Sequence, residues 1–322
     1  MCINRRHAVL GAAATLLPLV TRAQSALPDV LKIIVPFPAG NAIDASARWF
    51  GEAYRKATGR TVLIENKPGA ATTIAAAEVS RAKPDGSVVF WTTGSHTTTA
   101  VLMKKVPYDP IDGFTPLTMA ANGLGFMMVT RGNAPFSNVQ EVLDAAKKNP
   151  GKISYASTGV GGPPHVLGAA LAKSTGVELL HVPYRGDFFT DLISGVTDIM
   201  FVGPSLAMQF IEARKLKGIA MTGERRFPAL PTVPTFAESG VKDVHLPAYF
   251  GIYAPPNTPA PVLATLYEGV AKALKDPGLN TQFKSIGNEV TVLPPAEFKA
   301  YLQAEMQTLR RILPPLGIEM DV

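Results

Sequence analysis

Short apolar runs alternate along this chain with stretches in which apolar residues recur at helical spacing. Leu31–Val35 predicts a buried strand, and the apolar positions of 43–57 then follow at the spacing of a helix that ends at Gly59. A capping box of Ser137 and Gln140 is expected to open a later helix. Further strands are expected over 61–64, 87–91, 153–156, 178–182, 197–201 and 216–221, and helices over 74–82, 139–148, 166–174, 188–194, 205–213, 261–274 and 296–313. This alternation predicts an α/β fold of parallel sheets with helices on both faces.

Two apolar stretches punctuated by glycine, Leu117–Val129 and Val244–Ala254, interrupt the alternation. They flank a block that has its own complete set of strands and helices, so we interpret them as a pair of crossover connections. The predicted organisation is an inserted lobe over residues 122–245, joined by two strands to a discontinuous lobe of residues 27–121 and 246–322. Two α/β lobes joined in this way form a ligand cleft that closes about a hinge.

The first 23 residues have the pattern of an export signal that is removed. Arg5 and Arg6 precede an apolar run over Ala8–Val20, and the small residue Ala23 stands at the expected cut. The adjacent arginines leave the Sec and twin-arginine routes both open. Because the only cysteine, Cys2, lies in the removed segment, the mature chain forms no disulfide. We therefore expect a periplasmic protein.

Composition fits a soluble globular protein with a large core. Of all residues, 47% are hydrophobic and 17% are charged, and the roughly 300 that follow the signal are enough for two domains. Without the three arginines of the signal, 28 basic residues face 25 acidic ones, and the net charge falls from +6 to about +3. No Lys/Arg-rich block alternates with aromatic residues, so we expect no nucleic-acid partner and a mild preference for small anions.

Motifs of the common hydrolytic enzymes do not occur in the sequence. There is no Gly-x-Ser-x-Gly, no His-Glu-x-x-His and no second cysteine, and the histidines show no recurring metal-ligand spacing. We expect no catalytic residue, no metal and no cofactor. A secreted hydrolytic enzyme is the less favoured alternative.

Four turns that follow predicted strands, 36–44, 66–73, 92–97 and 157–165, are candidate ligand contacts. Ligands of open α/β sheets bind beyond the carboxyl ends of the strands, where helix N-termini attract anions. The alternative is that these glycines, hydroxyls and histidines only connect, cap and support the helices, and that Asp44 serves its own helix. The candidate residues are Phe37, Pro38, Ala39, Gly40, Asn41, Asp44, Thr92, Ser95, His96, Ser157, Thr158, Gly159, Gly161, Gly162 and His165.

Short motifs spread in order over the whole mature chain resemble those of one family. The resemblance is to the Bug (Bordetella uptake gene) family, the periplasmic substrate-binding proteins of tripartite tricarboxylate transporters. The motifs are Pro36-Phe37-Pro38-Ala39-Gly40, Asn66-Lys67-Pro68-Gly69-Ala70, Pro84-Asp85-Gly86, Pro107-Tyr108-Asp109-Pro110, Tyr155-Ala156-Ser157, Pro164-His165, His181-Val182-Pro183-Tyr184-Arg185-Gly186 and Ala229-Leu230-Pro231-Thr232-Val233-Pro234-Thr235.

The resemblance implies a type II periplasmic-binding-protein fold that captures an organic carboxylate for a membrane permease of one large and one small subunit. It also implies that loops 37–44 and 157–162 hold one carboxylate of the ligand, largely through backbone N–H groups and two ordered waters. We expect a monomer that binds a small molecule. A partner of a sensor kinase in carboxylate signalling would need the same pocket and is an alternative function.

Departures from the family pattern bear on the choice of ligand. Gly40-Asn41 replaces a glycine pair, Phe188-Phe189 occupies a segment that is usually small, and Val202-Gly203 stands where a polar pair, frequently Asp-Asn, is common. Without an aspartate to pair with an ammonium group, an amino acid ligand is disfavoured. The added rings favour an aromatic or otherwise apolar mono- or dicarboxylate. Candidate contacts here are Phe189, Val202 and Gly203; the alternative is that both phenylalanines belong to the core.

Overall fold

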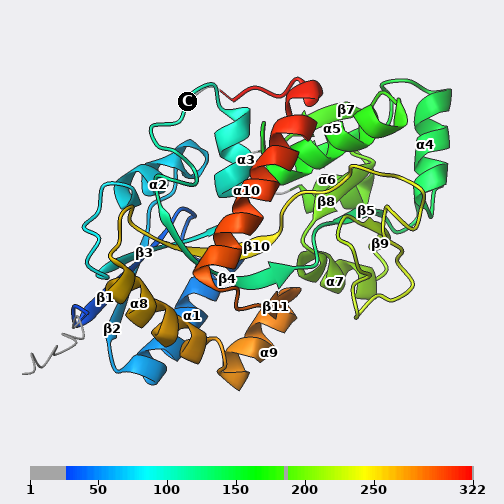
Figure 1. Ribbon diagram of the computed structural model, residues 1–322. Coiled ribbons are helices and arrows are strands. Elements are labelled where there is room, and N and C mark those ends of the chain that lie inside the picture. Colours follow the sequence, from blue (N-terminus) through cyan, green and yellow to red (C-terminus); the bar gives the residue numbers. More distant parts are fainter. Residues whose placement is uncertain (1–26, 185–187, 321–322) are drawn as a thin grey trace, which may run out of the picture.

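The computed structural model describes residues 27–184 and 188–320 (Figure 1). The predicted export signal and the Arg185-Gly186 part of the resemblance lie outside these residues. Strands and helices alternate along the described chain and build two sheets, one in each of two lobes. The predicted α/β class with two lobes is confirmed. No helix in the described ranges is long and apolar enough to cross a membrane.

The first lobe contains a six-stranded sheet in which Ile33 and Ile34 point to opposite faces, as neighbours in a strand do. Its strands are β1 (Val30–Val35), β2 (Thr61–Asn66), β3 (Val88–Thr93), β4 (Thr115–Gly123), β10 (Tyr249–Ala254) and β11 (Asn288–Val290). Ile33 packs in the cluster on the side of α1 (Ala42–Thr58), α8 (Ala260–Ala273) and α9 (Pro277–Ser285). Ile34 packs on the side of α2 (Thr73–Val79), which a short 3-10 helix, η1 (Ala70–Thr72), precedes, and of α10 (Pro295–Ile312).

The second lobe contains a five-stranded sheet of β5 (Met127–Arg131), β6 (Ser154–Ser157), β7 (Leu180–Pro183), β8 (Ile199–Val202) and β9 (Leu216–Met221). On one face of this sheet, Phe201 packs in a cluster with residues of α4 (Val139–Lys148) and α5 (Pro163–Thr175). On the other face, Met200 packs in a cluster with residues of α6 (Phe189–Ser194) and α7 (Pro204–Glu212). The strand order is β7-β6-β8-β5-β9.

Both sheets are mixed, whereas the alternating pattern predicts parallel sheets. β1 pairs in parallel with β2 and β3, and β6 with β7 and β8, but β10 and β5 run antiparallel to their neighbours. β5 and β10 are the strands by which the chain enters each sheet from the other lobe, and each runs antiparallel to both of its neighbours.

The two crossover stretches are only partly extended. Leu117–Val129 is divided between β4 and β5, and Val244–Ala254 forms a strand only from Tyr249 onward. β4 and β10 are paired antiparallel, so the outgoing and returning chains lie side by side in the first sheet. The exact lobe boundaries at 121/122 and 245/246 stay predictions.

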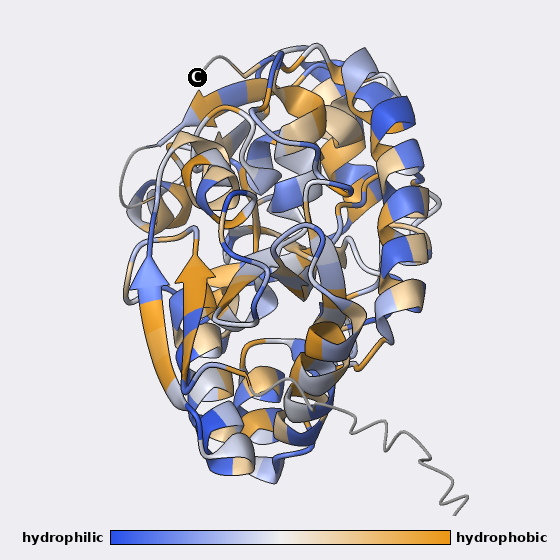
Figure 2. Cartoon of the chain, turned by 60° about the vertical axis from the view of Figure 1, so that its left-hand side comes forward, coloured by the Kyte–Doolittle hydropathy of each residue, from blue (hydrophilic) through white to orange (hydrophobic). Residues whose placement is uncertain are grey.

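Helix α10 packs on both lobes and runs across the junction between them (Figure 1). Phe298 and Leu302, near its start, pack in the core of the first lobe. Leu309, near its end, and Leu313 pack in the core of the second lobe, just before the 3-10 helix η2 (Pro314–Leu316). Figure 2 shows hydrophobic residues gathered along the interior strands and hydrophilic residues on outward helix surfaces. The prediction that the C-terminal helices pack back on the fold is confirmed.

Two local expectations need correction. Helix α4 is capped by Asn138, whose side chain accepts the N–H of Glu141, and Glu141 in turn accepts the N–H of Ser137. The expected box of Ser137 and Gln140 is therefore displaced by one residue. The turn expected over 92–97 instead leads into a helix, α3 (Ser95–Leu102). Four of its five buried residues are polar, three threonines and His96, and they give no apolar periodicity in the sequence.

Candidate ligand-binding site

A cavity of about 390 Å³ lies between the lobes and is lined by residues of both. From the first lobe come the loop between β1 and α1, the start of α3 and the segment that leads into β10. From the second lobe come the starts of α5 and α7 and the end of β8. Glycine and apolar side chains of the 123–126 segment, which joins β4 to β5, complete the wall. The cavity therefore lies where the resemblance places the ligand cleft.

Four helices begin at this cavity, α1, α3, α5 and α7, and the first residue of each lines it: Ala42, Ser95, Pro163 and Pro204. A helix N-terminus carries a partial positive charge and free N–H groups. None of the described lining residues is Asp, Glu, Lys, Arg or His. The cavity thus offers an anion the positive ends of helix dipoles without a countercharge in the wall.

The loop that opens α1 is held by its own side chains. Asn41 accepts two N–H groups of the first helical turn, and Asp44 accepts the N–H of Gly40 at 2.8 Å, Arg48 Nε at 3.0 Å and Asn66 Nδ2 at 2.9 Å. Burial raises the pKa of the Asp44 carboxyl, but these hydrogen bonds outweigh burial and hold the pKa below its ordinary value. Asp44 does not line the cavity, so it serves as a clamp on the loop.

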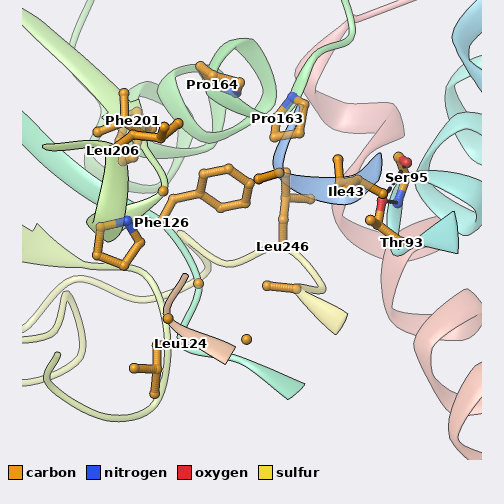
Figure 3. Close-up of a pocket in the computed structure, with 18 of the residues that line it drawn as sticks. Ile43, Thr93, Ser95, Leu124, Phe126, Pro163, Pro164, Phe201, Leu206 and Leu246 are labelled. Atoms are coloured by element: carbon orange, nitrogen blue, oxygen red, sulfur yellow. Dashed lines mark hydrogen bonds between the residues drawn. The ribbon is translucent and has the colours of Figure 1, made fainter. Parts of the chain in front are cut away.

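The start of α3 contributes hydroxyl groups. Thr93 Oγ1 and Ser95 Oγ are 2.7 Å apart, and both residues line the cavity (Figure 3). Thr92 and His96 are fully buried instead, and His96 Nε2 lies 2.8 Å from the carbonyl oxygen of Pro110. Desolvation lowers the pKa of His96 to about 4, so the ring is neutral at pH 7. His96 is a core residue of the first lobe and does not face the ligand.

A pair of stacked histidines supports the loop that opens α5. The rings of His165 and His181 are 3.8 Å apart and nearly parallel. His181 Nε2 lies 2.6 Å from Ser157 Oγ, and Gly161 N–H donates to His165 Nδ1 at 3.0 Å. Desolvation lowers the pKa of His165 to about 4, and the neighbouring His181 adds to this effect. In this loop Thr158 lines the cavity, while the histidines hold the backbone from behind.

The far side of the cavity, in the second lobe, is apolar. Phe201 and Val202 end β8 there, and Leu206 faces the cavity from the first turn of α7. Phe126, from the segment between β4 and β5, lies in the middle of the view in Figure 3, between this group and the hydroxyls of α3. Val202 lines the cavity, and none of the described lining residues is Asp or Glu, so an ammonium group placed beside Val202 finds no carboxylate in the wall.

The two adjacent phenylalanines have different surroundings. Phe188 lines the cavity. The Phe189 ring centroid lies 4.7 Å from that of Phe188 and 4.5 Å from that of Phe210 on α7, within a hydrophobic cluster of the second lobe. The ligand contact expected of Phe189 needs correction, because its side chain packs against Phe210 of α7 and does not line the cavity. Phe188 lines the cavity in its place.

The structure brings together part of the predicted site. Phe37, Ser95, Thr158, Val202 and Gly203 line the cavity. The remaining predicted residues are not among those that line the cavity: Pro38, Ala39, Gly40, Asn41, Asp44, Thr92, His96, Ser157, Gly159, Gly161, Gly162, His165 and Phe189. Sequence reasoning missed several lining residues of the crossover segments and of β11: Leu124, Phe126, Leu246, Tyr249 and Asn288. The crossover pattern itself was the signal for most of them, because such segments pass between the lobes.

Two α/β lobes, joined by paired crossover strands and enclosing a cavity at helix N-termini, define a solute-binding protein of the periplasmic type. Comparison with known proteins agrees. The family described as "Tripartite tricarboxylate transporter family receptor" matches residues 46–318, and the chain belongs to this family. The resemblance to the Bug proteins is thereby confirmed.

Relatives match over nearly the whole chain. The "UPF0065 protein in tcbD-tcbE intergenic region" of Pseudomonas sp. strain P51 is 31% identical over 97% of this chain and 94% of its own length. The structure of the periplasmic binding protein BugD superposes with a TM-score of 0.77 at 32% identity, covering 91% of this chain and 99% of BugD. A Rhodopseudomonas palustris protein solved with adipate gives a TM-score of 0.79 at 25% identity, over 91% and 99% of the two chains.

Proposed function

We propose that this protein captures an organic carboxylate in the periplasm and delivers it, as a monomer and without chemical conversion, to the permease of a tripartite tricarboxylate transporter. The observation that carries the proposal is the cavity at which four helices begin and in which no described lining side chain is charged. A carboxylate bound there is held by N–H and hydroxyl donors in a low-dielectric site, where such bonds are strong. The adipate in a structural relative supports this ligand class.

The apolar wall supports an aromatic or otherwise apolar carboxylate over an amino acid. Rings of Phe126 and Phe188 line the cavity, and each aromatic contact with a ligand ring contributes roughly 0.5–1.5 kcal/mol beyond the burial of area. An α-ammonium group would lie unpaired beside Val202, and an unpaired buried charge is strongly penalised.

Ligand binding is tested by thermal shift and calorimetry on protein freed of bound ligand by unfolding and refolding. The series is benzoate, terephthalate, adipate, citrate, aspartate and glutamate. A ligand at a concentration of 100 times its Kd stabilises the folded state by about 2.7 kcal/mol. We expect apolar carboxylates to bind and both amino acids to bind more weakly. If no carboxylate stabilises the protein, the proposed function is wrong.

Compartment and export are tested separately from binding. Protein released from cells by osmotic shock should begin near Gln24, because the apolar run and the small residue before it form a cleavage pattern. Recovery of protein that retains Met1 in the cytoplasmic fraction would contradict the periplasmic assignment. Substitution of Lys for both Arg5 and Arg6 distinguishes the twin-arginine route, which requires the pair, from the Sec route.

A further inference from the structure

The polarity of the cavity is one-sided. Hydroxyl groups of Thr93, Ser95 and Thr98 gather at the end formed by β3 and α3 in the first lobe. Phe201 and Leu206 lie on the opposite side of Phe126 in the close-up, at the end formed by the second lobe (Figure 3). Thr158 and Asn288 also line the cavity, so a ligand that fills it meets an end rich in hydroxyl groups and an end that is mostly hydrocarbon.

Helix α7 also begins at the apolar end, and its dipole alone would attract an anion there. Its first turn supplies few donors, however. Pro204 has no N–H, and the N–H of Leu206 donates to the carbonyl oxygen of Gly203 at 3.0 Å. Val202, Leu206 and Phe201 at this helix start are apolar. Ser205, in the same turn, adds one hydroxyl group, which is buried and has no hydrogen-bond partner among the described residues. A carboxylate at this end would thus find fewer donors to replace its water than at the end that holds three hydroxyl groups.

We propose that the ligand carries a single carboxylate, placed at the hydroxyl end, and an uncharged tail that lies against Phe126, Phe201 and Leu206. This inference rests on the proposed function and narrows its ligand class. It departs from the structural relative solved with adipate, which carries two carboxylates. The preference for a ligand with one carboxylate over a ligand with two comes from the apolar end of the cavity. Substitution of Leu206 is the simplest way to reverse this preference.

The test compares ligands that share a skeleton and differ by one carboxylate: hexanoate with adipate, and benzoate with terephthalate. Calorimetry gives Kd for each, and the ratio is taken in the pair that binds more tightly. We expect the monocarboxylate to bind at least tenfold more tightly. A smaller ratio overturns the inference and leaves the proposed function in place. If none of the four acids binds while another carboxylate of the thermal-shift series does, the inference is overturned; if no carboxylate of that series binds, the proposed function fails as well.

Leu206→Arg adds a cation at the apolar end of the cavity. Leu206 is 53% exposed, so the longer side chain is compatible with folding. We expect this variant to bind adipate at least tenfold more tightly than the natural protein and to lose the preference for hexanoate. Leu180→Arg is the matched control, because Leu180 is 52% exposed and does not line the cavity. Equal responses of the two variants would show that the apolar end does not select against the second carboxylate.

Ser95→Ala tests the other end. If the carboxylate shared by hexanoate and adipate lies at the hydroxyl end, the variant weakens both by the same factor, about fivefold for one hydrogen bond of ordinary strength. An unchanged Kd for hexanoate in folded Ser95→Ala protein would overturn the assigned orientation.

Discussion

Glu305 is a buried carboxyl group at the junction of the lobes, and replacing it by glutamine should change the pH dependence of stability. It lies on α10 with 8% of its surface exposed. Its Oε1 accepts a hydrogen bond from Thr97 Oγ1 on α3 and one from the Tyr249 hydroxyl on β10 at 3.4 Å. Desolvation raises the pKa of Glu305 to about 8, although these hydroxyls act in the opposite direction. The folded protein therefore keeps this carboxyl protonated at neutral pH.

The sign and size of the effect follow from the difference between the folded and unfolded states. Between pH 4.5 and about 8 the folded state holds a proton that the unfolded state has released, so the free energy of unfolding falls as the pH rises through this window. At about 1.4 kcal/mol per pH unit the whole window corresponds to roughly 5 kcal/mol. From pH 5 to pH 8 the expected loss is roughly 3–4 kcal/mol. Glu305→Gln keeps the size of the side chain and cannot ionise, so the loss should disappear.

Urea unfolding followed by tryptophan fluorescence at pH 5, 6, 7 and 8 measures this difference. Subtracting the values for Glu305→Gln from those of the natural protein cancels the titration of all other groups. Glu268→Gln, at an exposed position of α8, is the control and should leave the slope unchanged. If the curves of the natural protein and Glu305→Gln run parallel from pH 5 to 8, Glu305 is ionised in the folded state and the reasoning from burial is wrong.

Three further predictions follow from local contacts. Burial lowers the pKa of His165 to about 4, so as the pH falls below 6.5 the unfolded state binds a proton before the folded state does. In urea unfolding the free energy of unfolding should therefore decline from pH 6.5 toward pH 4, and it should decline less in His165→Gln. Gly168→Ala places a methyl group against the Tyr155 ring and should cost about 1–3 kcal/mol in urea unfolding, whereas Gly203→Ala, whose methyl meets no atom within 4 Å, should cost much less. Asn41→Ala removes the cap of α1 and should lower the free energy of unfolding by about 1 kcal/mol, whereas Asn41→Ser should keep most of the stability that the cap provides. Equal losses in both variants would contradict a capping role.

Much of the fold can be predicted from the sequence because each helix buries one apolar face and each central strand buries both. The helix over 42–58 is an example, since its buried positions Ala47, Phe50 and Tyr54 recur at helical spacing. Helix α3 shows where this reasoning fails. Its buried residues include His96 and three threonines, and a helix that buries polar side chains shows no apolar stripe in its sequence.

Loops that surround the ligand can be located from the order of strands and helices, but the direction of each side chain within them cannot. Asp44 and His165 lie in the predicted loops, yet both are turned toward their own backbone, as their hydrogen bonds show. Phe188 and Phe189 are neighbours in the sequence, and only the first faces the cavity. One residue along a helix turns the side chain by about 100°, so an error of one position exchanges a ligand contact for a core contact.

The apolar wall of the cavity was the hardest part to predict for a related reason. Phe126, Phe201 and Leu246 have the hydropathy of core residues, and all three pack in or against the core of the second lobe. A cleft that closes on an apolar ligand uses the same side chains as a core, because both exclude water from hydrocarbon. The pattern along the sequence therefore predicts that these residues are buried, and only the arrangement of the two lobes distinguishes burial against the chain from burial against a ligand. If the ligand is a monocarboxylate, the residues that select it are among those that the sequence presents as ordinary core.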